Sequence, residues 1–499
     1  MRKQGGYTEH YTAFPLRQIA AQDLTHGRQR AGYFLPPAPT LSTAARMIRS
    51  MPARTPSMPL ITARELSARA AAAAALLQRA GADTAPLAVV SASPAAIGVL
   101  APAAASLGLP LLPLDPALPE EIIAQLLAQT GAGVVVAERA YAGHGHIAVD
   151  EILACRATAA VPPSRLGPDD IALLVATSGS SGQPRAVMLT ARNLAAAAQA
   201  AATRTPLHPG DRWLACLPLF HIGGFSILTR CALAGADAVL LPGFDAARVW
   251  QALRTECITH LSLVPAMLAQ LLECSAEAPP ATLRHVLIGG AALSAELAQR
   301  AVRRGWPLQP TYGMSETASQ VATLERLSLP WRAGQLGPPL PGVELAVTQD
   351  GRLKIRGPMV MAGYANPGHR RGDGLEDGWF VSNDLAEIDD TGELRIIGRA
   401  DAVIISGGKK VHPAVVEEQL LRCPGVAAVA VTGRSDATWG EIVTAVYSGT
   451  LDETELLAWC RAHISSALRP RAALRVAALP QLSNGKPDRQ AIRQLAEAM

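Results

Sequence analysis

Short apolar runs alternate with alanine-rich stretches along the chain from Ile61 onward. The runs include GAGVVVAE (residues 131–138), DAVLLPG (237–243), THLSLVP (259–265) and RHVLIGG (284–290). Each run has the composition of a buried strand, and each intervening stretch has that of a helix. Strands that are separated by helices pair in parallel, because the helical crossover returns the chain to the same edge of the sheet. The pattern therefore predicts an α/β fold whose mostly parallel sheets are covered by helices.

The pattern of apolar and turn-forming residues changes after Gly334. The stretches GVELAVTQDGRLKIRG and AEIDDTGELRIIGR indicate antiparallel hairpins that turn at QDG and DDTG. Further on, GVAAVAVTG, EIVTAVYSG and a terminal helix indicate a small α+β unit. Since 499 residues are too many for one core, we predict several parts. These are an irregular, proline-rich extension (1–57), a large N-terminal domain with a β-rich subdomain (58–400) and a small, mobile α+β C-terminal domain (401–499).

The charge and the cysteines argue against several classes of protein. The formal net charge is +4 and no Lys/Arg run appears, so nothing indicates binding to nucleic acid or to an anionic membrane. The seven cysteines form no CxxC pair, which favours free thiols in a reducing compartment. The N-terminal MRK is not followed by the apolar segment of a secretory signal. We therefore expect a cytoplasmic protein.

Residues 85–114 carry no charge, which raises the question of a membrane span. A spanning helix needs about 20 continuous apolar residues, whereas five prolines interrupt this stretch. We expect a buried strand (PLAVVSA), a helix (AAIGVLAPAAASLG) and a second strand (PLLPL) in its place.

The stretch TSGSSGQPRAV (177–187) follows the apolar run IALLVA and is rich in glycine and hydroxyl side chains. Backbone N–H groups, hydroxyls and one arginine suit a clamp over a polyphosphate. The stretch is not a Walker loop, because it lacks the GK pair and Pro184 would block the helix that must start there. An ordinary Ser/Gly turn has the same composition.

Together with four further motifs, this stretch resembles the adenylate-forming superfamily, which includes acyl-CoA synthetases and adenylation domains. The motifs occur in the family's order over roughly residues 60 to 495. In the family the first motif closes over the β- and γ-phosphates of ATP. Gln183 and Arg185 stand where lysine is usual, and Ala186 replaces glycine. The resemblance implies that ATP is bound here by Thr177, Ser178, Gly179, Ser180, Ser181, Gly182 and Arg185.

The second motif, TYGMSETASQ (311–320), resembles the family's YGxTE. The resemblance implies that Tyr312 flanks adenine, that Ser315 contacts the α-phosphate, and that Glu316 is catalytic and positions Mg²⁺. Gly313 and the stretch that follows the run RHVLI are expected to line the same nucleotide site. That stretch consists of Gly289, Gly290 and Ala291.

The third motif, GWFVSNDLAEIDDTGELRIIGRAD (378–401), is the longest match. The resemblance implies that Asp384 and Arg399 bind the ribose hydroxyls of ATP and that Asp401 is the hinge between the two domains. Ser382 and Asn383 replace the usual Thr-Gly pair, and Asn tolerates the backbone conformation of such a turn.

Two motifs of the C-terminal region complete the set. In ISGGKKVHPAVVEEQL (405–420), the resemblance implies that Gly407 and Gly408 let the pantetheine arm of CoA pass close to the backbone. In SNGKPDR (483–489), it implies that Lys486 is the catalytic lysine that bridges the attacking carboxylate and the α-phosphate. The implied reaction is formation of an acyl-adenylate from a carboxylic acid and MgATP, followed by transfer to CoA after a domain rotation.

The stretch LPLFHIGGFSILTR (217–230) looks most like o-succinylbenzoate–CoA ligases of menaquinone synthesis. By this resemblance His221 is a catalytic and substrate-contacting residue that gates the site between half-reactions. Arg230 is expected to pair with a second carboxylate of the substrate, because a dianionic acid in a dry pocket needs a fixed cation. Gly223 replaces the usual serine.

Other functions share most of these motifs. The acid could be another aryl or medium-chain acid, although a fatty-acid pocket has no use for a buried cation. The acceptor could be a carrier protein instead of CoA. A non-catalytic nucleotide-binding homologue is the alternative from a different class, and the presence of Glu316, Asp384 and Lys486 argues against it. The sequence leaves open whether the protein is a homodimer.

Overall fold

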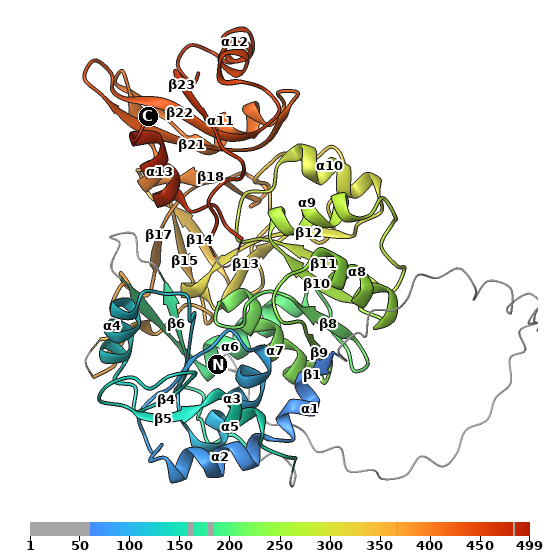
Figure 1. Ribbon diagram of the computed structural model, residues 1–499, viewed down its shortest axis with the longest axis vertical. Coiled ribbons are helices and arrows are strands. Elements are labelled where there is room, and N and C mark those ends of the chain that lie inside the picture. Colours follow the sequence, from blue (N-terminus) through green and yellow to red (C-terminus); the bar gives the residue numbers. More distant parts are fainter. Residues whose placement is uncertain (1–59, 158–162, 178–183, 367, 483–484) are drawn as a thin grey trace, which may run out of the picture.

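The computed structural model describes residues 60–157, 163–177, 184–366, 368–482 and 485–499 (Figure 1). The predicted extension of residues 1–57 lies outside the described residues. The described part holds two large sheets with helices between and outside them, a smaller antiparallel sheet, and a C-terminal α+β unit.

The first large sheet has the order β1-β9-β8-β10-β11-β12-β13. Neighbouring strands from β9 to β12 are parallel, whereas the two edge strands pair antiparallel. Helices α8 (Ala246–Thr255), α9 (Pro265–Cys274) and α10 (Ala295–Arg303) cover its outer face. The strands are β1 (Ile61–Thr62), β8 (Arg212–Ala215), β9 (Asp237–Leu240), β10 (His260–Leu263), β11 (His285–Ile288), β12 (Leu308–Met314) and β13 (Ser319–Thr323).

The second large sheet has the order β16-β7-β6-β3-β2-β4-β5, and α4 (Glu120–Thr130) packs on its outer face. Its strands β6, β3, β2, β4 and β5 are parallel, as predicted. Strands β6 and β7 form an antiparallel hairpin, because the connection between them is too short for a helical crossover. The strands are β2 (Leu87–Val90), β3 (Leu111–Leu114), β4 (Val134–Ala137), β5 (Gly145–Ala148), β6 (Ile171–Thr177), β7 (Arg185–Thr190) and β16 (Gly363–Tyr364).

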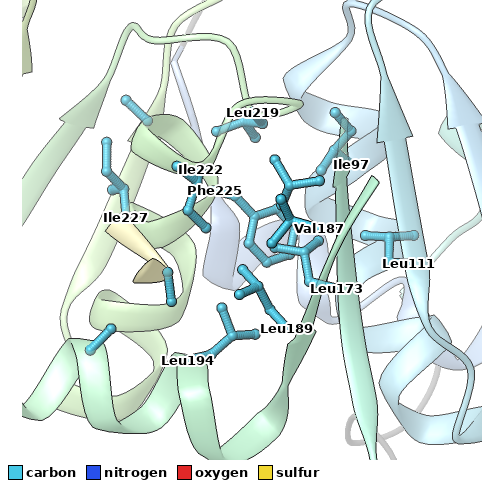
Figure 2. Packing of buried hydrophobic residues seen from close by; sticks show 14 of the residues in the cluster. Ile97, Leu111, Leu173, Val187, Leu189, Leu194, Leu219, Ile222, Phe225 and Ile227 are labelled. Carbon is cyan, nitrogen blue, oxygen red and sulfur yellow. The ribbon is translucent and has the colours of Figure 1, made fainter. Parts of the chain in front are cut away.

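A layer of helices is buried between the two sheets and shares one hydrophobic core with both. Figure 2 shows Ile222 and Phe225 of α7 facing Leu173, Val187 and Leu189 of β6 and β7. Burial of these side chains fixes how α7 is rotated about its axis, since apolar area removed from water is the main stabilising term. The layer contains α1 (Ala63–Ser67), α2 (Ala70–Arg79), α3 (Pro94–Leu107), α5 (Val149–Leu153), α6 (Ala191–Ala202) and α7 (Ile222–Ala234).

The two predicted hairpins are confirmed and join into one antiparallel sheet with the order β14-β15-β17-β18. The strands are β14 (Glu344–Val347), β15 (Arg352–Arg356), β17 (Phe380–Ile388) and β18 (Leu394–Arg399). Two short 3₁₀ helices, η2 (Ser315–Thr317) and η3 (Ala400–Ala402), follow β12 and β18.

The C-terminal part is an α+β unit with its own core, as predicted. Its sheet has the order β20-β19-β22-β21, and β23 pairs with β22. The strands are β19 (Ile404–Ser406), β20 (Lys409–Val411), β21 (Val426–Asp436), β22 (Gly440–Gly449) and β23 (Ala472–Arg475). The helices are α11 (Pro413–Leu420), α12 (Glu453–His463) and α13 (Arg489–Glu497).

The uncharged residues 85–114 form β2, α3 and β3, as the prolines and the strand pattern predict. Among the described residues, no helix combines the length and the apolarity that a bilayer crossing requires.

A column of stacked rings lies inside the first sheet. The ring of His260 stacks between those of Trp213 and His285, at centroid distances of 5.1 and 4.7 Å. Its Nε2 lies 3.0 Å from the carbonyl oxygen of Pro206, and its Nδ1 lies 2.7 Å from the hydroxyl of Thr259. These contacts suit a neutral ring, with Nε2–H as donor and Nδ1 as acceptor. Burial, and then the charge of a protonated His285, lower the pKa of His260 to about 4.

This buried imidazole predicts acid-sensitive folding. A histidine whose pKa is lowered in the folded chain contributes stability that is fully present above pH 6.5 and is lost as the pH falls toward about 4. From His260 we expect a loss of about 2 kcal/mol in the free energy of unfolding between pH 7 and pH 5. Urea unfolding of the wild type and of His260→Gln at both pH values measures this loss of unfolding free energy.

The difference in unfolding free energy between the wild type and His260→Gln should shrink by this amount at the lower pH. The exposed His208 supplies the control variant, His208→Gln, which should follow the wild type. An equal pH dependence in the wild type and His260→Gln would contradict the assignment.

Candidate active site

The predicted nucleotide residues gather where β11 and β12 end. These strands are parallel neighbours, so their carboxyl ends meet at one edge of the sheet, which is where ligands bind in open α/β sheets. Residues 289–291 directly follow β11. Tyr312 and Gly313 lie near the C-terminal end of strand β12, and Ser315 and Glu316 are the first two residues of η2.

A tyrosine, a carboxylate and an arginine meet beside this edge. The hydroxyl of Tyr312 donates to Oδ2 of Asp384 at 2.6 Å, and Nη1 of Arg399 lies 3.5 Å from Oδ1. The antiparallel pairing of β17 with β18 sets Asp384 directly opposite Arg399. Burial, and then the charge of Asp384, raise the pKa of Tyr312 well above its usual value. The phenol therefore keeps its proton and acts as the donor.

Ser382 and Asn383 lie inside strand β17 and not in the turn expected from the sequence, and Asn383 does not have a positive φ, so the unusual pair needs no special backbone conformation. The hydroxyl of Ser382 accepts a hydrogen bond from the backbone N–H of Asp384 at 3.1 Å. The amide of Asn383 donates to Asp401 at 3.4 Å. Asp401 also accepts from Nε of Arg399 at 2.8 Å. The structure thus gives Asp401 two contacts at the start of the C-terminal part, and its role as a hinge stays a prediction.

Glu316 is held by a residue that the motifs did not identify. The hydroxyl of Tyr364 donates to Oε1 of Glu316 at 2.8 Å, and the guanidinium carbon of Arg185 lies 5.0 Å from the centre of the Tyr364 ring. Burial, and then the charge of Glu316, raise the pKa of Tyr364, while Arg185 acts in the opposite direction. The phenol is therefore protonated when it meets the carboxylate.

The surroundings of Glu316 fit a magnesium ion that is shared with a nucleotide. In the described ranges, no group of three or more His, Cys, Asp or Glu side chains forms a ready-made metal cage. Mg²⁺ usually takes one or two carboxylates and completes its shell with phosphate oxygens and water. A single carboxylate, oriented through one oxygen by Tyr364, matches that pattern.

Lys486 reaches from the C-terminal part to the nucleotide edge. Its Cε lies 3.1 Å from the place that a Cβ on Gly290 would take, so the lysine packs closely against this glycine, whose φ of +78° favours glycine. Its backbone carbonyl accepts from the N–H of Leu482 at 2.8 Å. Burial lowers the pKa of Lys486, and the charges of Asp384 and Glu316 oppose this effect. The predicted catalytic lysine and the predicted nucleotide residues are therefore together.

His221, the residue before α7, and Arg230 within it each have one buried nitrogen without a hydrogen-bond partner among the described residues. These atoms are Nε2 of His221, at the N-terminal end, and Nε of Arg230, two turns along. Burial, and then the charge of Lys486, lower the pKa of His221 to about 4, so its ring is neutral at neutral pH. An unsatisfied buried polar atom costs free energy in the folded protein, which marks His221 and Arg230 as candidate ligand contacts.

Arg230 lies in the protein interior and keeps its charge. Its side chain is buried, its Nη2 donates to the hydroxyl of Ser319 at 3.2 Å, and its guanidinium carbon lies 5.6 Å from the centre of the Trp213 ring. Burial lowers its pKa to about 10, so it stays protonated at neutral pH. The surrounding side chains leave no space beside it that would hold a water molecule. These neighbours are Leu194, Ala197, Ala198, Ser226, Thr229 and Ala318.

The predicted phosphate-binding stretch connects β6 to β7. Its described ends, Thr177 and Arg185, face each other across the hairpin, and the hydroxyl of Thr177 donates to the carbonyl of Arg185 at 3.4 Å. Arg185 is exposed and lies against Tyr364. The other predicted phosphate contacts lie outside the described residues: Ser178, Gly179, Ser180, Ser181 and Gly182.

Gly407 and Gly408 form the tight turn between β19 and β20. The N–H of Gly407 donates to the carbonyl of Trp439 at 3.0 Å, and a Cβ on Gly407 would lie 2.6 Å from the Trp439 ring. A larger residue therefore could not take this place without moving the indole. The guanidinium carbon of Arg471 lies 3.8 Å from the centre of the Trp439 ring.

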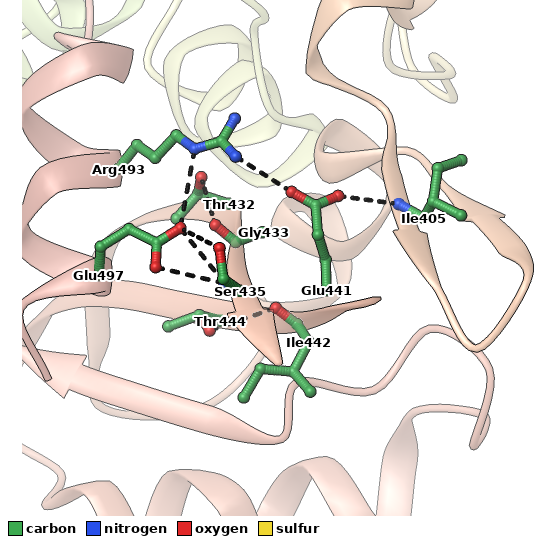
Figure 3. A network of polar contacts seen from close by, with 9 residues as sticks. All are labelled: Ile405, Thr432, Gly433, Ser435, Glu441, Ile442, Thr444, Arg493 and Glu497. Carbon is green, nitrogen blue, oxygen red and sulfur yellow. Dashed lines mark hydrogen bonds and ion pairs between the residues drawn. The ribbon is translucent and has the colours of Figure 1, made fainter. Parts of the chain in front are cut away.

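A polar network ties this turn to the last helix (Figure 3). Glu441 accepts from the N–H of Ile405 at 3.1 Å and from Arg493 of α13 at 3.2 Å. Glu497 of the same helix contacts Arg493 and accepts from the hydroxyl of Ser435 at 3.0 Å. Since α13 begins three residues after Lys486, the glycine turn and the predicted catalytic lysine belong to one connected unit.

Sequence reasoning missed Tyr364 and Trp439. Each is an isolated aromatic residue outside the five motifs, and its partner lies more than thirty positions away or in another sheet. Scarcity is the one signal that could have found them, because aromatic residues are only 4% of the chain. Tyr364 is such a rare residue, and mutation of the few aromatic residues would have tested it for a role in the site.

Comparisons with known proteins identify the family of this chain. The sequence profile of the AMP-binding enzyme family matches residues 58–365, and that of the AMP-binding enzyme C-terminal domain matches residues 415–486. A 2-succinylbenzoate–CoA ligase of Bacillus cereus is 36% identical over 338 residues, which are 65% of this chain and 70% of that protein.

Solved structures extend the likeness over most of the chain. The o-succinylbenzoate CoA synthetase of Bacillus subtilis, in complex with the acyl-adenylate intermediate OSB-AMP, has a TM-score of 0.74 and 29% identity and covers 86% of this chain and 91% of that one. ATP-bound MatB from Rhodopseudomonas palustris has a TM-score of 0.77 and 26% identity, with coverages of 87% and 93%. Both the fold and the family profile lead to the same conclusion: the chain belongs to the AMP-binding enzyme family.

Proposed function

We propose that this chain is an AMP-forming acid–thiol ligase that joins o-succinylbenzoate to CoA in menaquinone biosynthesis. The relatives named 2-succinylbenzoate–CoA ligase, and the similar synthetase structure with OSB-AMP, support the substrate. The family supports the reaction type, in which a carboxylate is first activated with ATP.

The observation that carries the choice of acid is the buried, charged Arg230. Among the described residues no carboxylate pairs with it, and its Nε has no partner. An isolated buried charge is costly unless a counter-charge offsets it. The second carboxylate of o-succinylbenzoate would supply that counter-charge, and a guanidinium binds a carboxylate through two parallel hydrogen bonds. A monocarboxylic acid would leave the cation without a counter-charge.

The first half-reaction is an in-line displacement at the α-phosphorus of ATP. The substrate carboxylate attacks, the bond to the β-phosphate oxygen breaks, and pyrophosphate leaves an acyl-adenylate behind. Lys486 would bridge the attacking carboxylate and the α-phosphate, so that its charge offsets the charge of the transition state. Its place against Gly290, near Asp384 and Glu316, supports that role.

The remaining residues of the site would each bind a different part of the nucleotide. We propose that Tyr312 lies against adenine and that Asp384 and Arg399 take the ribose hydroxyls, since a carboxylate accepts from both. Thr177 and Arg185, with the glycine-rich stretch between them, would hold the outer phosphates, and Ser315 the α-phosphate. Mg²⁺ held at Glu316 would neutralise phosphate charge.

In the second half-reaction the CoA thiol attacks the acyl carbon and AMP leaves. We propose that the C-terminal domain (401–499) turns about Asp401, which withdraws Lys486 and brings the turn at Gly407 and Gly408 to the acyl group. His221, whose neutral ring has no hydrogen-bond partner at Nε2 among the described residues, would gate the path between the two half-reactions. The boundaries of the large domain (58–400), the cytoplasmic location and a homodimer stay predictions from the sequence.

Pyrophosphate release with a panel of acids tests the function directly. We expect turnover with o-succinylbenzoate, and far less with benzoate, a cinnamate or octanoate, because these have one carboxylate. The assay is run with and without CoA, and the thioester is identified by mass spectrometry. Preference for a monocarboxylate would contradict the choice of acid, and pyrophosphate release without any CoA thioester would favour a carrier protein as acceptor.

Removal of the buried cation should change specificity. We expect Arg230→Ala to lower kcat/KM for o-succinylbenzoate roughly 10- to 100-fold, because one charge-assisted pair is lost, while a monocarboxylate is affected little. Arg230→Met removes the charge but keeps more side-chain volume than Arg230→Ala, so the same change in specificity in both variants would exclude a loss of packing as the cause. Arg212, which pairs with Glu256 elsewhere in the first sheet, supplies the control Arg212→Met. An equal loss for both kinds of acid would make Arg230 structural.

Removal of the lysine should separate the half-reactions. We expect Lys486→Ala to slow adenylate formation by a factor on the order of 10²–10³, because a charge that acts in the transition state is lost. Thioester formation from preformed acyl-adenylate should continue. Lys354→Ala, at the Trp379 ring in the antiparallel sheet, is the control. Equal loss in both half-reactions would rule out the proposed role.

A further inference from the structure

The side chain of Tyr364 connects two residues that belong to different parts of the nucleotide site. Its hydroxyl donates to Oε1 of Glu316 at 2.8 Å, and the guanidinium carbon of Arg185 lies 5.0 Å from its ring centre. Strand β16 pairs antiparallel with β7, with Tyr364 opposite Val187, so the ring sits two residues from the strand end that carries Arg185. The hydroxyl of Tyr364 therefore contacts Glu316, and the face of its ring contacts Arg185.

The ring itself has little freedom to move. A Cβ on Gly374 would lie 2.5 Å from Cδ2 and Cε2 of Tyr364, so the backbone there approaches the ring closely. The N–H of Tyr364 donates to the carbonyl of Asp373 at 3.0 Å, and its own carbonyl accepts from Asn366 at 3.1 Å. These contacts fix the backbone and leave only glycine at position 374. The site is built around the position of the phenol.

Glu316 is also held from its backbone. Its carbonyl accepts from the N–H of Met361 at 2.8 Å, and Met361 lies three residues before Tyr364. The segment that contains Met361 and Tyr364 thus contacts both the main chain and the side chain of Glu316. A carboxylate fixed at one oxygen presents its other oxygen in a defined direction, which is what preorganised binding of a charge requires.

We propose that Tyr364 is a positioning residue with two separable functions in ATP binding. Its hydroxyl orients Glu316 for the magnesium ion, and its ring orients Arg185 for the outer phosphates. The inference rests on the proposed function, in which Glu316 and Arg185 serve these ligands. It adds that the metal-binding and phosphate-binding residues are coupled through one side chain.

Two substitutions separate the two functions. Tyr364→Phe removes the hydroxyl and keeps the ring, so it should weaken binding of MgATP roughly tenfold, by loss of one hydrogen bond to a charged group. Binding of ATP in the presence of EDTA should fall much less, because the ring beside Arg185 is kept. Tyr364→Leu also removes the face under Arg185, so it should weaken binding of ATP in EDTA as well. Isothermal titration calorimetry of the full-length chain with both forms of ATP measures this, without turnover.

Tyr141 offers a matched control, because its buried ring also lies near an arginine, at 5.2 Å from the guanidinium carbon of Arg139. Tyr141→Phe should bind both forms of ATP as the wild type does. Unchanged binding of both forms by Tyr364→Phe would overturn the proposal, as would an equal loss in MgATP and in ATP with EDTA. A wild type that binds MgATP no better than ATP in EDTA would instead contradict the proposed role of Glu316, which is a failure of the proposed function.

Discussion

The burial of one helical layer between two sheets is the constraint on which the site depends. Helix α7 is covered on both sides, and Ile222 and Phe225 pack toward β6 and β7 (Figure 2). Close-packed interiors leave a helix in such a layer little freedom to rotate or slide. His221 at its N-terminal end and Arg230 within it are therefore held in the interior at fixed places, and one buried nitrogen of each has no hydrogen-bond partner among the described residues. A charged residue in this position has a stability cost that a charged ligand would offset.

Charge compensation organises the other half of the site. Two carboxylates, those of Asp384 and Glu316, each accept a hydrogen bond from a tyrosine hydroxyl, at 2.6 and 2.8 Å. Both also act on Lys486, where their charges oppose the effect of burial on the pKa of the ammonium group. Groups arranged in this way need little reorganisation when charge develops on a bound phosphate, which is the usual source of electrostatic catalysis. The same arrangement explains why Lys486 can approach the nucleotide edge although it comes from the C-terminal part.

Much of this architecture was predictable because it follows from local pattern. The alternation of apolar runs with alanine-rich helices predicts the parallel strands, and the turns at QDG and DDTG predict the hairpins, all of which the structure contains. The antiparallel edge strands were not predicted. A two-residue strand such as β16 has no period to detect, and its pairing with β7 joins segments that are far apart in the chain. The motifs led to Asp384, Glu316 and Lys486 through family resemblance.

Local sequence pattern therefore determines the type and order of the elements, since strand and helix periodicity and turn chemistry act over a few residues. Tertiary structure alone decides which distant side chains meet. Tyr364 reaches Glu316 and Arg185 only because β16 pairs with β7, and Trp439 reaches Gly407 only because the β21–β22 turn folds over the β19–β20 turn. Such contacts depend on packing between elements, and a ring or a carboxylate leaves no trace of its partner in the residues beside it.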